Sequence, residues 1–371
     1  MSHKAEAVIE QLYAEIPLRR PQKLNEVESP NMLIQADNLI ALKWLIEEKG
    51  LEGQIDLVYI DPPFATGGRF TVDGTRAATI SSSQKGRLAY EDSLTGEDYL
   101  EFLRARLILL RRLLSERGSI YVHIDYKIGH YVKVLMDEVF GIENFRNDIT
   151  RIKCNPKNFR RKGYGNIKDM ILFYTKGEKF IWHEPYAPYS EEDLARLFPK
   201  RDAQGRRYTT VPIHAPGETR KGATSRPFKG MLPPKGRHWR TDVATLEAWD
   251  REGLIEWSSR GVPRKKIYAD ERQGKRMQDI WEFKDPQYPV YPTEKNADLL
   301  DLIVRTSSDE GSYVLDCFCG SGTTLVAAQK RGRKWIGIDS SPLAIEVAQR
   351  KLADLPRTLF APSVAFELYR I

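Results

Sequence analysis

The sequence lacks any run of about 18 apolar residues, which is the length that a membrane-spanning helix requires. Its first ten residues carry three charges where a secretory signal would need an apolar stretch. Cysteine is scarce, because Cys154, Cys317 and Cys319 are too few and too unevenly spaced for a disulfide framework or a four-ligand zinc site. We therefore expect a cytoplasmic protein without membrane association or a bound metal.

The chain of 371 residues is long enough for two domains, or for one large core with an insertion. Apolar residues make up 41% and charged residues 29% of it, which excludes the disordered and collagen-like classes. The composition therefore predicts an ordinary soluble globular protein.

The net charge of +7 is distributed unevenly along the chain. Residues 151–290 contain 30 Lys and Arg against 18 Asp and Glu, whereas the remainder contains 28 against 33. The same segment holds five of the seven tryptophans. Basic and aromatic side chains together suit phosphate contact and base stacking. A solvated basic face is the alternative, but the contrast in charge between the segments favours nucleic-acid binding by residues 151–290.

The outer parts of the chain alternate short apolar strands with amphipathic helices, which is the α/β pattern. Candidate strands rich in Val, Ile and Tyr lie at 32–35, 55–60, 119–124, 312–315 and 334–338. Near-continuous apolar strands are typical of a parallel sheet that is buried on both faces. Leucines spaced three and four apart from Leu100 to Leu114 predict a helix that ends near Gly118.

The middle of the chain has a different texture. Proline and glycine are frequent between Pro212 and Pro263, and helical periodicity is limited to short stretches near 191–198 and 245–249. We expect an inserted module rich in loops and strands.

A glycine-rich turn follows the candidate strand at 312–315. Gly320 and Gly322 allow the backbone to approach a ligand closely, and the helix start at Thr323 offers free N–H groups. Asp339, at the end of the next strand, can bind both hydroxyls of a ribose. The phosphate-loop and dinucleotide-binding fingerprints each require a residue that this turn lacks. The pattern therefore predicts a nucleoside-binding unit, with a tight strand-to-helix connection as the structural alternative.

The second informative motif ends the candidate strand at 55–60 and consists of Asp61, Pro62, Pro63 and Phe64. The carboxylate of Asp61 and the carbonyl of Pro62 can accept both hydrogens of an exocyclic amino group, while Phe64 stacks on the ring. The prolines stiffen the turn. The motif favours amine chemistry on a flat ring over the simpler alternative, a strand terminator with a local cap.

Together, the motif at 61–64 and the glycine-rich motif at 316–322 resemble the amino-group DNA methyltransferases, which methylate adenine N6 or cytosine N4 with S-adenosylmethionine. The motif order, with a basic segment between, is similar to that of the β group, which includes the modification subunits of type III restriction systems. The resemblance extends over most of residues 30–350. It implies an α/β, Rossmann-like fold with a mostly parallel seven-stranded sheet and a circularly permuted motif order.

The resemblance also implies roles for individual residues. Catalytic roles fall to Asp61, Pro62, Pro63 and Phe64. Cofactor-binding roles fall to Asp37, Asn38, Thr293, Lys295, Asp316, Phe318, Gly320, Ser321, Gly322, Thr323 and Asp339.

Two of these positions have structural alternatives. Asp37 can equally cap a helix that begins at Leu39, and a helix start at Glu294 is the alternative for the segment around Lys295. His123 and Asp125 match a strand end of the family, but a buried or turn-capping pair is favoured over a catalytic one.

The implied organisation has four parts: an N-terminal helical extension at 1–30, a catalytic half at 31–150, the basic insertion at 151–290 as a candidate DNA-target-recognition module, and a cofactor-binding half at 291–371. Adenine N6 is the expected target because Asp leads the motif at 61–64, where the cytosine enzymes usually have Ser. Cytosine N4 methylation and a non-catalytic DNA-binding subunit are the alternatives. Duplex DNA is the expected partner, with a restriction nuclease subunit and a second copy of the chain as further candidates.

Overall fold

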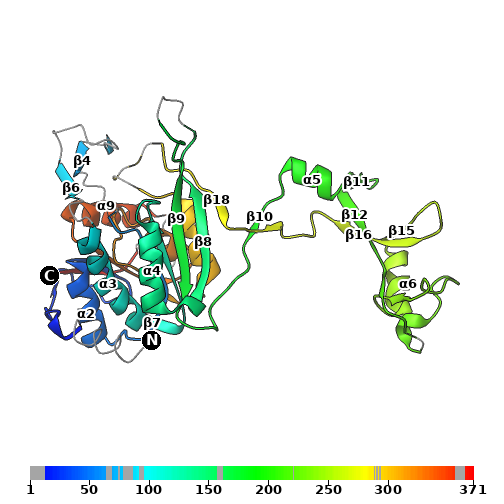
Figure 1. Ribbon diagram of the computed structural model, residues 1–371, viewed down its shortest axis with the longest axis horizontal. Coiled ribbons are helices and arrows are strands. Elements are labelled where there is room, and N and C mark those ends of the chain that lie inside the picture. The colour runs from blue at the N-terminus through cyan, green and yellow to red at the C-terminus, as the bar shows by residue number, and fades with distance from the viewer. Residues whose placement is uncertain are drawn as a thin grey trace. The chain divides into compact units, whose positions relative to one another are not determined.

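The computed structural model describes most of the chain. The described residues are 13–63, 69–73, 76–77, 87–91, 96–156, 162–219, 221–287, 289, 291, 294–355 and 364–371. They form two compact units, of which the first comprises Met1–Glu184 with Gln278–Ile371 and the second comprises Pro185–Met277 (Figure 1).

A ten-stranded sheet organises the first unit. In spatial order its strands are β1 (Gln22–Lys23), β21 (Glu367–Arg370), β2 (Met32–Gln35), β20 (Lys334–Asp339), β19 (Tyr313–Asp316), β3 (Ile55–Ile60), β7 (Leu114–Ile124), β9 (Lys168–Thr175), β8 (Phe145–Ile152) and β18 (Ile280–Glu282). Neighbours from β21 to β7 pair in parallel, whereas β9 is antiparallel to both β7 and β8.

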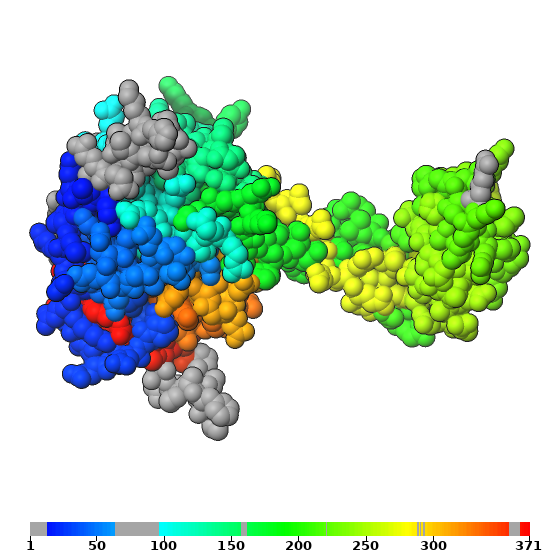
Figure 2. Space-filling view, turned by 90° about the horizontal axis from the view of Figure 1, so that it is seen from below, coloured from blue at the N-terminus to red at the C-terminus, as the bar shows by residue number. Residues whose placement is uncertain are grey.

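The expected mostly parallel α/β sheet is therefore confirmed. It has ten strands rather than the expected seven because β1 and β21 extend one edge and β18 extends the other. β1 pairs antiparallel with β21, so chain segments near the two ends lie side by side, as the adjacent blue and red surfaces of Figure 2 show.

Helices cover both faces of the sheet. On one face, α2 (Asn38–Glu47), α3 (Gly96–Leu113) and α4 (Gly129–Phe140) form a core with sheet residues such as Ile120 and Val122. Side chains alternate along a strand, so Tyr121 faces the other way. Its hydroxyl lies 2.8 Å from the hydroxyl of Ser307, in α7 (Ala297–Ser307). The helix α8 (Thr323–Lys330) packs against α7, and α9 (Pro342–Ala353) packs against α8.

The predicted strands at 32–35 and 55–60 match β2 and β3, and the leucine helix matches α3. One boundary was wrong: α3 ends at Leu113 rather than near Gly118. Leu114 is fully buried and pairs with Ile55, so the chain enters β7 before the glycine that was expected to end the helix.

The described part of the expected N-terminal helical extension contains a single helical turn, at 13–15, followed by β1. The side chain of Lys43 in α2 donates hydrogen bonds to the carbonyl oxygens of Tyr13 and Ile16, at 3.0 and 2.6 Å. A small three-stranded sheet of β4 (Arg69–Asp73), β5 (Arg76–Ala77) and β6 (Arg87–Glu91) also belongs to the first unit. No helix in the described ranges is long and apolar enough to cross a bilayer.

The second unit is built on a four-stranded antiparallel sheet. Its strands in spatial order are β11 (Lys200–Arg201), β12 (Arg207–Pro212), β16 (Pro263–Tyr268) and β15 (Ile255–Trp257). Two ribbons accompany it, β10 (Tyr186–Ala187) with β17 (Lys275–Arg276) and β13 (His214–Pro216) with β14 (Arg237–Trp239). The helices α5 (Glu191–Leu197) and α6 (Val243–Arg251) lie where short helices were predicted.

This unit has a hydrophobic core of its own, made by Ile213, Phe228, Trp239, Leu246 and Ile255. Its bounds, Pro185–Met277, are narrower than the insertion expected at 151–290. The difference arises because β9, β18 and the last two residues of β8 fall within 151–290 but pair in the ten-stranded sheet.

Candidate active site

The two motifs singled out in the sequence meet at the rim of the ten-stranded sheet that is formed by the carboxyl ends of its parallel strands. This rim is called the ligand edge below. β3, β19 and β20 are adjacent and parallel, so their carboxyl ends share an edge. Asp61 follows β3, Asp316 ends β19 and Asp339 ends β20. In open α/β sheets this edge is where ligands bind.

Asp61 is held by an ion pair. Lys295 Nζ lies 2.7 Å from Asp61 Oδ2, and the two side chains are 10% and 16% exposed, respectively. The other carboxylate oxygen, Oδ1, is buried and has no hydrogen-bond partner among the described residues. An unpaired buried acceptor is unfavourable unless a ligand provides the missing donor, so Asp61 Oδ1 is a candidate acceptor for a ligand N–H.

Asp316 stabilises the glycine-rich turn from beneath. Its carboxylate accepts hydrogen bonds from Thr324 Oγ1, at 2.6 Å, and from the backbone N–H of Phe318, at 3.0 Å. Burial is the main reason that the pKa of Asp316 rises to about 7, and the charges of Asp61 and Asp339 raise it further against the opposing hydrogen bonds. The charges of Asp61 and Asp339 thus act on Asp316, which ends the strand between β3 and β20.

The turn itself brings Asp339 to the ligand edge. Gly320 and Gly322 have φ values of 48° and 76°, which are left-handed conformations that favour glycine. The backbone N–H of Gly320 donates to Asp339 Oδ2 at 2.9 Å, and that of Ser341 donates to Oδ1 at 2.8 Å. Burial raises the pKa of this carboxyl. Each oxygen keeps a second lone pair, so the fixed carboxylate can still accept from two hydroxyl groups.

The ligand edge therefore combines a glycine-rich turn that suits a nucleoside with the Asp61 carboxylate, whose Oδ1 lacks a hydrogen-bond donor among the described residues. The family model described as DNA methylase, named for N6 and N4 enzymes, matches residues 55–350. The chain belongs to the N6/N4 DNA methylase family. This confirms the resemblance seen in the sequence, and with it S-adenosylmethionine as the cofactor.

Curated relatives agree with this membership. The Type II methyltransferase M.EcaI of Enterobacter cloacae is 44% identical over 330 residues, which cover 87% of this chain and 70% of that protein. M2.LlaDCHI, a Type II methyltransferase of Lactococcus lactis subsp. cremoris, is 34% identical over 359 residues, covering 93% of this chain and 97% of that protein. The StyLTI Mod subunit of a type III restriction-modification enzyme of Salmonella typhimurium is 26% identical over 80% of this chain, which spans about half (49%) of that subunit.

The residues at the edge fit the cofactor of the DNA methylases. The left-handed turn at Gly320 and Gly322 exposes backbone to a ligand, and the Asp339 carboxylate matches the two hydroxyls of a ribose. The hydroxyls of Ser321 and Thr323 lie 3.3 Å apart at the start of α8. Contact of the cofactor with these residues stays a prediction. The same holds for Phe318, whose ring packs against that of Phe102.

Asp37 and Asn38 have well-defined partners inside the protein. Asp37 caps α2 by accepting from the backbone N–H of Leu39 at 2.7 Å, as its structural alternative predicted. Arg106 of α3 donates to Asp37 at 3.2 Å and to Asn38 Oδ1 at 2.5 Å. Asn38 in turn donates to the carbonyl of Cys317 at 2.7 Å, so it links α2 to the glycine-rich turn.

Two predicted site residues, Phe64 and Thr293, lie outside the described residues. Pro62 is buried and Pro63 is half-buried beside Asp61. Lys295, for which cofactor contact stays a prediction, forms an ion pair with the Asp61 carboxylate.

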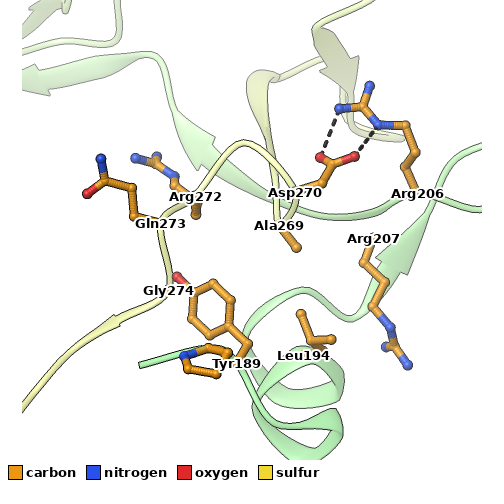
Figure 3. Close-up of a pocket in the computed structure, with 10 residues that line it drawn as sticks. Tyr189, Leu194, Arg206, Arg207, Ala269, Asp270, Arg272, Gln273 and Gly274 are labelled. Atoms are coloured by element: carbon orange, nitrogen blue, oxygen red, sulfur yellow. Dashed lines mark hydrogen bonds and ion pairs between the residues drawn. The ribbon is translucent and has the colours of Figure 1, made fainter. Parts of the chain in front are cut away.

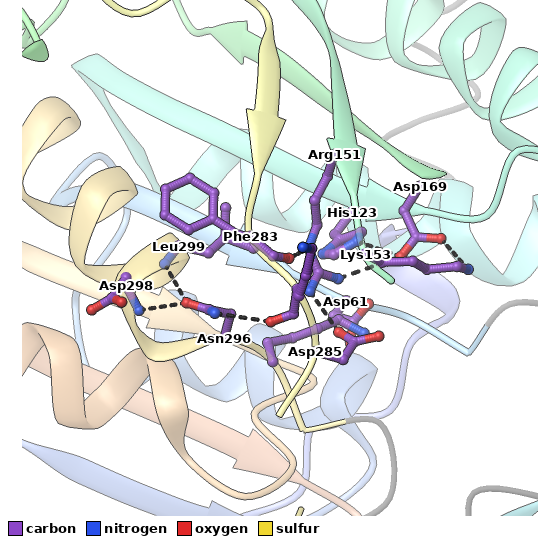
Figure 4. Close-up of polar contacts among 12 residues, drawn as sticks. Asp61, His123, Arg151, Lys153, Asp169, Phe283, Asp285, Asn296, Asp298 and Leu299 are labelled. Carbon is purple, nitrogen blue, oxygen red and sulfur yellow. Dashed lines mark hydrogen bonds and ion pairs between the residues drawn. The ribbon is translucent and has the colours of Figure 1, made fainter. Parts of the chain in front are cut away.

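Sequence reasoning missed a buried network next to Asp61 (Figure 4). His123 Nδ1 lies 2.8 Å from the Tyr59 hydroxyl, and its Nε2 lies 3.2 Å from Asp169 Oδ2. The other oxygen of Asp169 accepts from Lys153 at 2.5 Å. Arg151, also buried, contacts Asp169 at 3.5 Å. The partners are far apart in sequence, so no local pattern could reveal them.

Burial lowers the pKa of His123, which favours the neutral imidazole. Burial alone would raise the pKa of Asp169, but His123 and Lys153 outweigh it and lower that pKa. The neighbouring strand-end residue, Asp125, accepts from the backbone N–H of Lys127 at 2.9 Å. His123 is therefore buried and Asp125 caps a turn, as predicted from the sequence.

The second unit contains a cavity of about 470 Å³ (Figure 3). Arg206 beside it pairs with Asp270 at 2.8 Å and stacks over the Tyr268 ring, while Arg207 pairs with Glu191 at 3.4 Å. Arg272 lines the same cavity. Tyr268, together with Trp239 in the separate core of this unit, is buried. These two aromatic residues therefore pack inside the unit itself.

Proposed function

We propose that this DNA methylase transfers a methyl group from S-adenosylmethionine to the exocyclic N6 amino group of adenine in duplex DNA. The observation that carries the proposal is the buried Oδ1 of Asp61, which lacks a donor among the described residues and lies at the same sheet edge as the glycine-rich turn. An amino group is a donor that fits this oxygen.

The residues at the edge divide the work between the two substrates. Asp61 Oδ1 and the carbonyl of Pro62 accept the two hydrogens of the amino group, which favours a pyramidal nitrogen with an available lone pair. Asp339 binds the ribose hydroxyls of the cofactor, and the turn at Gly320 and Gly322 lies along its methionine part. S-adenosylmethionine, when bound, supplies an electrophilic methyl group on a positively charged sulfur.

Adenine is preferred over cytosine in this proposal because Asp61 leads the Asp-Pro-Pro-Phe motif. In the cytosine N4 enzymes that this sequence resembles, Ser usually takes that place. Cytosine N4 methylation is the second candidate, since either base offers the same type of amino group to Asp61.

A base inside a duplex cannot reach a carboxylate at a sheet edge, so the target nucleotide must leave the stack, at a cost of a few kcal/mol. Phosphate contacts can offset this cost. The second unit contains 20 Lys and Arg against 12 Asp and Glu between residues 185 and 277, which supports a role in DNA contact.

The similarity to a Mod subunit supports a place in a restriction-modification system, with a nuclease subunit as the corresponding partner. A homodimer is a further proposal from the resemblance to the β group.

The test is to incubate the protein with radiolabelled S-adenosylmethionine and genomic DNA from a bacterial strain that lacks DNA methylation. The DNA is then digested to nucleosides, which are separated by chromatography. We expect label in N6-methyldeoxyadenosine. Label in N4-methyldeoxycytidine would support the second candidate, and DNA binding without any label would indicate a non-catalytic subunit.

A further inference from the structure

Two oppositely charged residues that are consecutive in sequence, Glu294 and Lys295, reach toward different parts of the candidate site. Lys295 forms its ion pair with Asp61 Oδ2. Glu294 forms an ion pair with Lys351 of α9, and the same ammonium donates to Ser321 Oγ at 2.9 Å. The segment before α7 is thus connected to the Asp-Pro-Pro motif and to the glycine-rich turn.

The ion pair makes the two oxygens of Asp61 unequal. Oδ2 is engaged by the ammonium, whereas Oδ1 is buried without a partner among the described residues. A carboxylate without the ammonium could rotate and present either oxygen, or neither, to a ligand. The ion pair therefore restricts the carboxylate to one orientation in which Oδ1 is the available acceptor.

The environment makes this restraint effective. The Lys295 and Asp61 side chains are 10% and 16% exposed, so water screens their attraction only weakly. Exposed ion pairs hold their partners loosely, but a shielded pair at 2.7 Å has a defined geometry. Methyl transfer depends on such geometry, because a misplaced reacting group loses rate steeply.

We propose that Lys295 is a positioning residue for methyl transfer, which acts through Asp61 and not through the cofactor. The inference rests on the proposed function. It differs from the role that the family resemblance implies for Lys295, namely contact with S-adenosylmethionine. The two roles predict different losses when the ammonium is removed: a positioning residue affects the rate at saturating cofactor, whereas a cofactor-binding residue affects cofactor affinity.

The experiment compares the full-length variants Lys295→Met and Lys295→Arg with the wild-type chain. The rate of methyl transfer to unmethylated genomic DNA is measured in a single turnover at saturating cofactor, and the Kd for S-adenosylmethionine is measured separately by calorimetry. We expect Lys295→Met to lower the rate about 100-fold, since the carboxylate loses its orientation. Its Kd for the cofactor should stay within about threefold of wild type. Lys295→Arg, which keeps the charge, should recover most of the rate.

Lys23→Met is the matched control. Lys23 lies 2.7 Å from Glu367 Oε1, the same distance as in the Lys295 pair, but on the edge strands β1 and β21. Its loss should leave both the transfer rate and the cofactor Kd unchanged. A wild-type rate in Lys295→Met, or a deficit that saturating cofactor removes, would overturn the proposal.

A second measurement separates this proposal from the proposed function. The unfolding midpoints of Asp61→Ala, Lys295→Met and the double variant form a cycle that does not depend on activity. We expect the double variant to lose about 3 °C less than the sum of the two single losses, because either single change leaves a shielded charge unpaired. If the wild-type chain methylates no DNA, the proposed function fails, and the cycle still decides whether Lys295 holds Asp61. Additive losses would refute the restraint.

Discussion

The backbone N–H of Gly320 donates a 2.9 Å hydrogen bond to Asp339 Oδ2. The glycine-rich turn and the end of the next strand thus form one unit, in which the turn holds the carboxylate that is expected to bind the cofactor ribose. Ser341 holds the other oxygen of that carboxylate. The turn and the carboxylate should therefore be affected together by substitution.

Asp339→Ala should weaken the binding of S-adenosylmethionine by about 10- to 100-fold, since hydrogen bonds to a charged group contribute about 1.5–3 kcal/mol. Calorimetry on the purified variant measures this directly. Asp148→Ala removes an exposed carboxylate elsewhere in the first unit and serves as the control. Unchanged affinity in Asp339→Ala would mean that the ribose lies elsewhere.

Asp61→Ala should behave in the opposite way, because it removes the acceptor for the target amino group. We expect the rate of methyl transfer to fall about 1,000-fold or more, in the range for loss of a group that acts on the reacting amine. The cofactor Kd should change little. A large loss of cofactor affinity in this variant would show that Asp61 belongs to the cofactor site.

Gly322→Ala should disturb the turn more than its backbone angle alone requires. Its φ is 76°, and an added Cβ would lie 2.9 Å from the Cβ of Ala348 in α9. Gly50 offers a matched control, with a φ of 64° and no atom within 4 Å of the added Cβ. Both variants incur the left-handed penalty of about 1–2 kcal/mol, but only Gly322→Ala adds a clash. We expect a lower unfolding midpoint and weaker cofactor binding in Gly322→Ala than in Gly50→Ala, and equal effects would contradict the tight approach of α9.

Asp316 should make the stability of the protein depend on pH near neutrality. Its pKa rises from 3.8 to about 7 on folding, so between these pH values the folded state binds more protons than the unfolded state. The contribution of Asp316 to stability is therefore present at low pH and is lost as the pH rises through about 7. Asp316→Asn cannot titrate, so the free energy of unfolding of wild type minus that of the variant should fall between about pH 4 and pH 7, the interval between the unfolded and folded pKa values. Urea unfolding at several pH values tests the sign, and a difference that rises with pH would contradict it.

The sequence was sufficient to predict the sheet because the strands are locally encoded. Ile55–Ile60 is a nearly unbroken apolar run, and a strand buried between two layers of helices requires little else. The position of the site at the carboxyl ends of the strands was predictable for the same reason, since Asp61 and Asp339 come directly after such apolar runs. The meeting of both motifs at one site then followed from the parallel pairing of β3 with β19 and of β19 with β20.

The sequence could not predict contacts that depend on long-range packing. Lys295 is 234 positions from Asp61, and a lysine before a helix carries no local sign that it will pair with a particular carboxylate. The same holds for Arg151 and Asp169, which meet because β8 pairs with β9. The limits of the inserted unit were also hidden, because residues 151–162 contain six Lys and Arg and no Asp or Glu, so the basic composition begins before Pro185, where the unit starts.

The second unit should bind DNA through exposed basic side chains near β14. Exposed basic side chains lie in and around the strand Arg237–Trp239, and we propose to replace three of them in one variant, namely Lys235→Gln, Arg237→Gln and Arg240→Gln. For each phosphate that the variant no longer binds, the slope of log Kobs against log salt should become shallower by about 0.9. Fluorescence anisotropy with a labelled duplex at several salt concentrations measures the slope.

The control for this variant removes the same charge from the first unit by substituting three exposed residues, Arg20→Gln, Lys179→Gln and Arg370→Gln. Net charge alone would weaken binding equally in both triple variants, because long-range attraction depends on total charge. Direct phosphate contacts would reduce the slope only in the variant of the second unit. Equal slopes in the two variants would therefore refute a DNA-contacting surface at β14, even if both bind DNA less tightly than the wild-type chain does.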